Sequence, residues 1–193
     1  MLGAMLNGWL ALATAALATV SPTAAAGASS AAQTPAPAPA PAELPAILDA
    51  VLAAAQAPGA RAVLVNVWAT WCDPCRQEMP DLIRFYRDHR GEGLRLVLIS
   101  ADDEQDRGEV ARVLAEADLP AGTPSFIKRG DDMKFINGLD RHWSGALPAS
   151  FLFDGRGRKR HTWAGPVTYH SLERGVASLL MTPTTPKQPR RRP

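Results

Sequence analysis

The chain has 193 residues, of which 46% are hydrophobic and 21% charged, a composition typical of a globular protein with one domain of ordinary size. Its formal net charge of +2 comes from the end of the chain. Four of the 21 Lys and Arg residues lie in residues 182–193, which leaves 17 basic residues against 19 Asp and Glu in the remainder. That balance argues against a nucleic-acid-binding surface on the domain.

Residues 1–26 are predicted to be a secretory signal peptide. The apolar run "WLALATAALATV" is too short to span a bilayer comfortably, and "SPTAAAG" after it offers an A-x-A cleavage site near Ala26. No Lys or Arg precedes Arg61, so the usual positive region is reduced to the amino terminus, and a retained N-terminal membrane anchor is the alternative. We therefore expect a periplasmic or otherwise extracytoplasmic location.

The two flanks of the expected domain have the composition of unfolded chain. Residues 27–42, "GASSAAQTPAPAPAPA", are rich in Ala and Pro and uncharged, so they bury too little apolar surface to offset the entropy of ordering them. Residues 182–193 form a basic, Pro-rich tail that we expect to be disordered and solvated. The folded domain is therefore predicted to span residues 43–181.

The domain reads as alternating helices and strands. Apolar positions at helical spacing predict a helix from Glu43 to about Gly59. The apolar runs at 62–68 and 94–100 predict parallel strands buried on both faces. Further elements are expected as a helix after the cysteines to about His89, a helix around 110–117, a short strand at 124–128, a hairpin at 150–165 with its turn at 154–157, and a helix from about 168. This order predicts an α/β domain with a mixed sheet.

The chain has two cysteines, Cys72 and Cys75, separated by two residues in "WCDPC". A structural zinc site needs four ligands, but the four histidines are scattered and no two lie three to five residues apart. A structural disulfide across so short a gap contributes little stability. The pair is therefore predicted to be chemically reactive.

The surrounding sequence indicates how the two thiols differ. A strand ends at Trp68 and Pro74 suits the first turn of a helix, which places Cys72 at a helix N-terminus, where free N–H groups stabilise a thiolate. Cys75 lies one turn further in and is expected to be more buried. We predict that Cys72 is the nucleophile and Cys75 the resolving thiol in thiol–disulfide exchange. A peroxide-reducing cysteine is not indicated, because no T-x-x-C pattern precedes Cys72.

The stretch "WATWCDPCRQEMP", residues 68–80, resembles the active-site signature of the TlpA/ResA-like thiol-disulfide oxidoreductases in the thioredoxin-like superfamily. The similarity extends over about residues 43–181. It implies a thioredoxin-like α/β fold, a mixed central sheet flanked by helices, with a central α/β insertion at about 119–146. It also implies the following site: Cys72 and Cys75 as the redox pair, Glu78 as active-site acid, Pro148 as a cis-proline, and Trp71, Leu147 and Pro148 as substrate-binding residues. The redox-active disulfide would be the only redox group, with no cofactor and no metal.

Some residues keep two interpretations. Glu78 either moves protons at Cys75 or only helps to charge the first turns of its helix, and Asn66 stands where thioredoxins proper have a buried Asp. Five residues of the insertion either cap a surface helix or contact a partner: Asp131, Asp132, Asp140, His142 and Trp143.

The function predicted from these observations is an exported protein-disulfide reductase. Its clients would be proteins with disulfides or thiols, for example in cytochrome c maturation or copper-protein assembly, a membrane electron donor would recharge it, and it would act as a monomer. The negative charge of Asp73 beside Cys72 opposes the helix dipole and makes the Cys72 thiolate less stable. A less stable thiolate makes the protein a weaker oxidant, so we expect a reduction potential nearer that of thioredoxin, about −270 mV, than that of DsbA, about −120 mV. The alternatives are an oxidase of protein thiols, or a thioredoxin-fold binding module or chaperone without turnover.

Overall fold

A six-stranded mixed sheet forms the centre of the domain in the computed structural model, which describes residues 38–181. The strands lie in the order β1-β4-β3-β2-β5-β6. The first four in that order run parallel, whereas β5 is antiparallel to β2 and β6 is antiparallel to β5. The strand bounds are β1 Ala40–Glu43, β2 Ala62–Trp68, β3 Leu94–Ser100, β4 Ser125–Arg129, β5 Ala149–Asp154 and β6 Lys159–Ala164.

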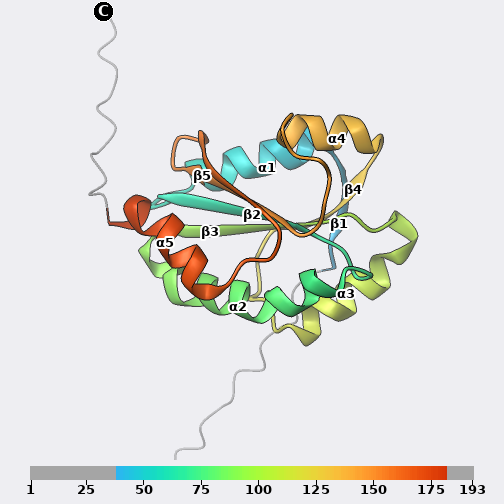
Figure 1. Cartoon of the computed structure of the whole chain (residues 1–193), viewed down its shortest axis with the longest axis horizontal. Coiled ribbons are helices and arrows are strands. Elements are labelled where there is room, and N and C mark those ends of the chain that lie inside the picture. The colour runs from blue at the N-terminus through green and yellow to red at the C-terminus, as the bar shows by residue number, and fades with distance from the viewer. Residues whose placement is uncertain (1–37, 182–193) are drawn as a thin grey trace, which may run out of the picture. The chain divides into compact units, whose positions relative to one another are not determined.

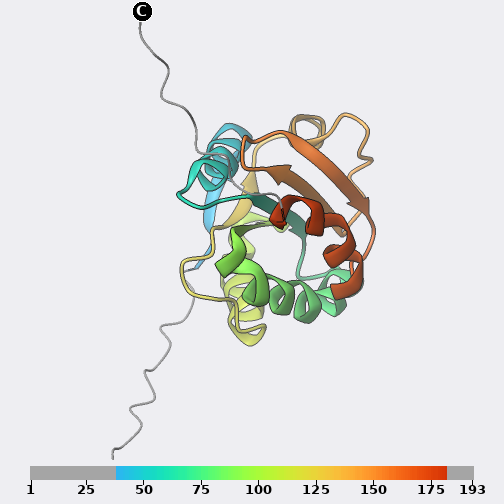
Figure 2. The ribbon, with the colours of Figure 1, turned by 90° about the vertical axis from the view of Figure 1, so that its left-hand side faces the viewer.

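Helices cover both faces of the sheet (Figure 1). Helices α1 and α4 pack on one face, and α2, α3 and α5 pack on the other; Figure 2 shows α2 and α5 side by side. Because both faces are covered, every residue of β2 is buried, which is the reason its sequence is apolar except for Asn66. The helix bounds are α1 Leu44–Gln56, α2 Asp73–His89, α3 Arg107–Glu116, α4 Asp132–Leu139 and α5 Tyr169–Leu180, with short 3-10 turns at Arg90–Glu92 and Glu104–Asp106.

The predicted central insertion supplies one strand and one helix, β4 and α4. Strand β4 pairs with β3 on one side and β1 on the other, so the insertion widens the sheet from within. Helix α4 is capped by Asp131, whose side chain accepts a hydrogen bond from the backbone N–H of Lys134 at 2.8 Å. The fold is thioredoxin-like with a central α/β insertion, as the sequence predicted.

The remaining insertion residues also have structural contacts. Trp143 is buried and packs edge-on against Phe135 and Phe151, so it is a core residue and does not offer a surface to a partner. Asp140 accepts a hydrogen bond from the backbone N–H of His142 at 3.0 Å and pairs with Lys159. Asp132 lies in the first turn of α4 and pairs with Lys128.

One predicted boundary is wrong. The sequence predicts a linker over residues 27–42, but Ala40 to Ala42 belong to strand β1. The sequence "APAE" has no strand pattern, and β1 forms because its backbone pairs with β4, a strand of the insertion. The signal peptide, residues 27–37 of the linker and the basic tail lie outside the described residues. Within residues 38–181, no helix is long and apolar enough to cross a membrane.

Candidate active site

The two cysteines form a disulfide at the N-terminus of α2. Their Cα atoms lie 5.3 Å apart. Cys72 is the N-cap residue of α2, and its sulfur accepts a hydrogen bond from the backbone N–H of Cys75 at 3.3 Å. Pro74 lies in the first turn, where a backbone N–H has no partner within the helix, so the missing N–H of proline breaks no hydrogen bond. Cys72 is 6% exposed and Cys75 is 0% exposed. Of the two cysteines, only Cys72 is exposed to another protein.

Asp102 fixes the turn that leads from β2 to Cys72. This buried side chain follows β3, and its carboxylate accepts hydrogen bonds from the backbone N–H of Thr70 at 3.0 Å and from the Thr70 hydroxyl at 2.6 Å. The hydroxyl of Ser100 donates to the same carboxylate. Sequence reasoning missed Asp102, although an acidic residue just after β3, the strand beside the one that leads to Cys72, was a usable signal.

Glu78 faces the interior of the domain, one turn after Cys75 on α2. Its residue is 4% exposed, and each carboxylate oxygen accepts one hydrogen bond: Oε1 from Asn66 Nδ2 at 2.7 Å and Oε2 from the backbone N–H of Val167 at 2.6 Å. Burial raises the pKa of Glu78 to about 7, and the hydrogen bonds from Val167 and Asn66 oppose that rise. A carboxyl group with such a pKa can take up or release a proton near neutral pH.

The Leu147–Pro148 peptide is cis, and it is the only cis bond within residues 38–181. This is the proline for which the resemblance to the TlpA/ResA-like family implied a cis peptide. Ala149 pairs with Val67 near the end of β2, so this peptide lies at the same end of the sheet as the disulfide. The carbonyl of Pro148 accepts a hydrogen bond from the backbone N–H of Gly165 at 2.9 Å.

The two tryptophans near the disulfide differ sharply in exposure. Trp68, at the end of β2, is 0% exposed and belongs to the core, whereas Trp71, immediately before Cys72, is 68% exposed. A large apolar side chain exposed beside the disulfide is suited to contact another protein.

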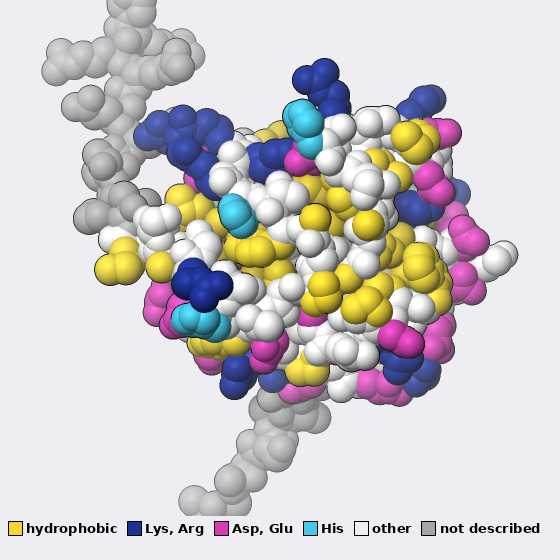
Figure 3. Space-filling model, in the orientation of Figure 1, with side chains coloured by type: hydrophobic (Ala, Val, Ile, Leu, Met, Phe, Trp, Pro, Cys, Tyr) yellow, Lys and Arg dark blue, Asp and Glu magenta, His cyan; other side chains and the backbone are white. Residues whose placement is uncertain are grey.

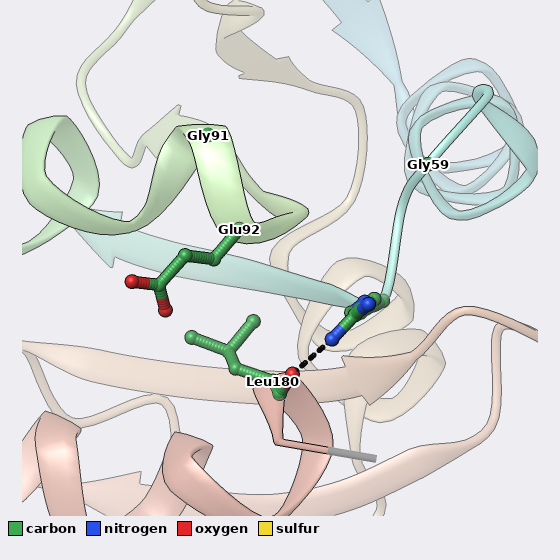
Figure 4. A pocket seen from close by; sticks show the side chains of 5 residues that line it. Gly59, Gly91, Glu92 and Leu180 are labelled. Atoms are coloured by element: carbon green, nitrogen blue, oxygen red, sulfur yellow. Dashed lines mark hydrogen bonds between the residues drawn. The ribbon is translucent and has the colours of Figure 1, made fainter. Parts of the chain in front are cut away.

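One surface hollow lies apart from the disulfide. A hollow of about 400 Å³ is lined by Gly59, Arg61, Gly91, Glu92 and Leu180, where Arg61 donates to the carbonyl of Leu180 (Figure 4). Arg61 immediately precedes β2, so this hollow lies at the opposite end of that strand from Cys72. On the face shown in Figure 3, basic and acidic side chains are interspersed around a more hydrophobic middle. The described residues contain no cluster of three or more His, Cys, Asp or Glu that could hold a metal ion.

The chain belongs to the AhpC/TSA family, whose model matches residues 37–161. Over 117 residues it is 34% identical to the thiol:disulfide interchange protein HelX of Rhodobacter capsulatus, with 61% of this chain and 60% of HelX covered. It is 29% identical over 120 residues to the thiol-disulfide oxidoreductase ResA of Bacillus cereus, with 58% and 60% covered. The resemblance read from residues 68–80 is thereby confirmed.

Solved structures agree on the fold. A thioredoxin-related protein from Neisseria meningitidis serogroup B is 26% identical, with a TM-score of 0.52 over 64% of this chain and 88% of that one. A thioredoxin-family thiol:disulfide interchange protein from Chlorobium tepidum has a TM-score of 0.54 at 23% identity, over 76% of this chain and 97% of that one. The chain spans about three-fifths of the length of HelX and ResA.

Proposed function

We propose that the chain is an exported thiol-disulfide oxidoreductase that reduces disulfides of client proteins. The observation that carries the proposal is the unequal exposure of two disulfide-bonded cysteines at a helix N-terminus. A client can reach Cys72 but not Cys75, and the helix N-terminus stabilises the thiolate form of Cys72. This asymmetry is what a nucleophile and a resolving thiol require.

The reaction starts from the reduced pair. The Cys72 thiolate attacks one sulfur of a client disulfide, the client S–S bond breaks, and the released client thiolate takes a proton. The Cys75 thiolate then attacks the Cys72 sulfur, which forms the Cys72–Cys75 disulfide and frees the second client sulfur. Two electrons pass from the cysteine pair to the client, and a dithiol donor must return them.

Glu78 acts as the proton acceptor for Cys75 in the second step. Its place three residues after Cys75 on α2 puts it within one helical turn of that thiol, and its pKa of about 7 suits an acceptor that must also give the proton up again. A side chain that only charged the helix would face solvent, whereas Glu78 is buried and bound from β2 and the loop before α5.

Clients bind in extended form beside the disulfide. The backbone of Leu147, next to Pro148, pairs with a client segment, and Trp71 packs against its side chains. The clients are proteins with disulfides or thiols, for example in cytochrome c maturation or copper-protein assembly, and a membrane electron donor regenerates the dithiol. The protein works as a monomer in the periplasm or another extracytoplasmic space, carried there by a signal peptide or held by an N-terminal anchor. The names of HelX and ResA support thiol–disulfide exchange as the activity, and the apolar N-terminal run supports export.

The two cysteine variants test the roles directly. Cys72→Ser should abolish dithiol-dependent reduction of insulin, because the attacking thiolate is gone. Cys75→Ser should form a mixed disulfide with the client that persists, which mass spectrometry detects as an adduct on Cys72. Turnover of the Cys75 variant at the wild-type rate would contradict the assignment.

A redox titration against a dithiol buffer tests the direction of electron flow. We expect a potential nearer the thioredoxin value of about −270 mV than the DsbA value of about −120 mV. A potential above roughly −180 mV would favour an oxidase of protein thiols. Client binding without any exchange in the wild-type protein would favour a binding module.

A further inference from the structure

The carboxyl group of Glu78 is held by a side chain that the exchange reaction itself does not use. Asn66 lies in β2, is 0% exposed, and directs both N–H bonds of its side-chain amide to named acceptors. One bond goes to Glu78 Oε1 at 2.7 Å and the other to the hydroxyl oxygen of Ser150 at 3.0 Å. Ser150 is the residue paired with Asn66 across β2 and β5, so the sheet fixes the direction of the amide.

This arrangement leaves one buried polar atom without a partner. Asn66 Oδ1 accepts no hydrogen bond from the described part of the chain, which destabilises a folded protein. The carboxylate of Glu78 explains why Asn66 Oδ1 has no partner within residues 38–181. Only the N–H side of the amide can face an ionised carboxylate at hydrogen-bond distance, so the oxygen has to point away. The amide is therefore oriented to serve Glu78 rather than to satisfy its own groups.

We propose that Asn66 is a positioning residue that sets the proton affinity of Glu78 by donating a hydrogen bond that favours the ionised carboxylate. The inference deepens the proposed function, on which the use of Glu78 as a proton acceptor rests. Without this donor, burial would hold Glu78 in its protonated form at neutral pH, and the carboxyl group could not accept the proton of Cys75.

The surroundings of Glu78 make this donor decisive. The groups that contact its carboxyl oxygens, the Asn66 amide and the Val167 backbone N–H, are neutral, and no charged neighbour contributes to its raised pKa. The other titratable groups near it on α2 are Cys75, one turn earlier, and Asp81, one turn later, which is engaged with Arg84 and the backbone N–H of Tyr169. Within residues 38–181, no Lys, Arg or His side chain is hydrogen-bonded to the Glu78 carboxyl oxygens, so no cation replaces the lost donor.

The direct test follows the Glu78 carboxyl carbon by NMR in the oxidised protein, where neither a client nor turnover is needed. In the wild-type protein we expect a midpoint of about 7. In Asn66→Leu, which is close to Asn in size but lacks the donor, the midpoint should rise by about one to two pH units, the equivalent of one hydrogen bond to a charged group. In Asn66→Asp, two carboxyl groups would share one proton, and the upper midpoint should rise as well.

Asp81→Asn is the matched control, because it removes a carboxylate from the same helix that likewise accepts a backbone N–H, that of Tyr169 at the start of α5. It should leave the Glu78 midpoint unchanged. An unchanged midpoint in both Asn66 variants would overturn the proposal, as would an equal shift in the Asp81 control.

Kinetics separate this inference from the proposed function. If Glu78 serves Cys75, Asn66→Leu should lower the exchange rate at pH 7 about five-fold, since the ionised fraction of Glu78 falls from about a half to about a tenth for a shift of one unit. The rate should recover at higher pH. A shifted Glu78 midpoint with an unshifted pH–rate profile would support the role of Asn66 and remove Glu78 from the proposed reaction.

Discussion

Two buried carboxyl groups lie toward opposite ends of the paired strands β2 and β5, and their pKa values move in opposite directions. Asp154 pairs with Ala62 at the start of β2, in the turn of the hairpin. Glu78 is held near the other end, through Asn66 and its partner Ser150. The pKa of Asp154 is lowered to about 2, whereas the pKa of Glu78 is raised to about 7.

Burial acts in the same direction on both groups, so burial alone cannot explain the difference. It would raise the pKa of Asp154 too, but the backbone N–H groups of Arg158 and Arg156 and the guanidinium groups of Arg160 and Arg158 outweigh it. Glu78 has two neutral donors and no cation. The number and charge of the donors therefore decide whether a buried acid stabilises a turn or carries a proton.

The largest expected effect is a loss of folding stability when the buried Glu78 becomes ionised. Because the pKa of Glu78 is higher in the folded chain than its ordinary value of 4.5, the folded state binds more protons between pH 4.5 and about 7. The free energy of unfolding should therefore fall as pH rises through that window, by up to about 3 kcal/mol from this group. Glu78→Gln should lack this fall, which urea denaturation of the two oxidised proteins at pH 5 and pH 8 measures.

The difference between the two proteins isolates Glu78 from every other titrating group. If the wild-type protein and Glu78→Gln lost equal stability between the two pH values, ionisation of Glu78 would not destabilise the fold. The pKa of Glu78 would then not be raised, and the contrast with Asp154 would be wrong.

Asp154 should show the opposite dependence. Its pKa is lower in the folded chain than the ordinary 3.8, so its contribution to stability is present above pH 3.8 and is lost as pH falls toward 2. Asp154→Asn should destabilise the protein by about 2 kcal/mol at pH 7, and the difference from wild type should shrink near pH 2. Urea denaturation at both pH values measures this, and disulfide exchange should be unaffected. A constant difference at all pH values would mean that the lost contacts do not involve the charge.

The same two ends show what the sequence could and could not predict. The turn at Asp154 and the reactive pair at Cys72 were both predicted, since each depends on residues that are close in sequence: Asp and Gly in a tight turn, and cysteine and proline at a helix start. The buried parallel strands were predicted from their apolar runs. These features are encoded locally.

What the sequence did not predict depends on strand register. Strand β1 exists because β4 pairs with it, and Asn66 meets Glu78 and Ser150 because β2 is registered against β5 and packed against α2. Asp102 reaches Thr70 because β3 lies beside β2. The pKa of Glu78 likewise follows from its donors and its burial, and neither is visible until the chain is folded.

The smallest effect is expected from Arg160, one of the two arginines whose guanidinium groups bind the Asp154 carboxylate. Its guanidinium donates to Asp154 Oδ2 at 2.8 Å from Nε, but its side chain is 43% exposed, so water and salt screen the pair. Arg160→Ala should lower the free energy of unfolding by about 0.5 to 1 kcal/mol, and by less at high salt.

Arg156→Ala is the matched control, because Arg156 binds Asp154 through its backbone N–H, which alanine keeps. Denaturation at low and high salt measures both. A change in the pH–rate profile of exchange in Arg160→Ala would show that the two carboxyl sites are coupled, since the hairpin turn and the disulfide lie at opposite ends of β2.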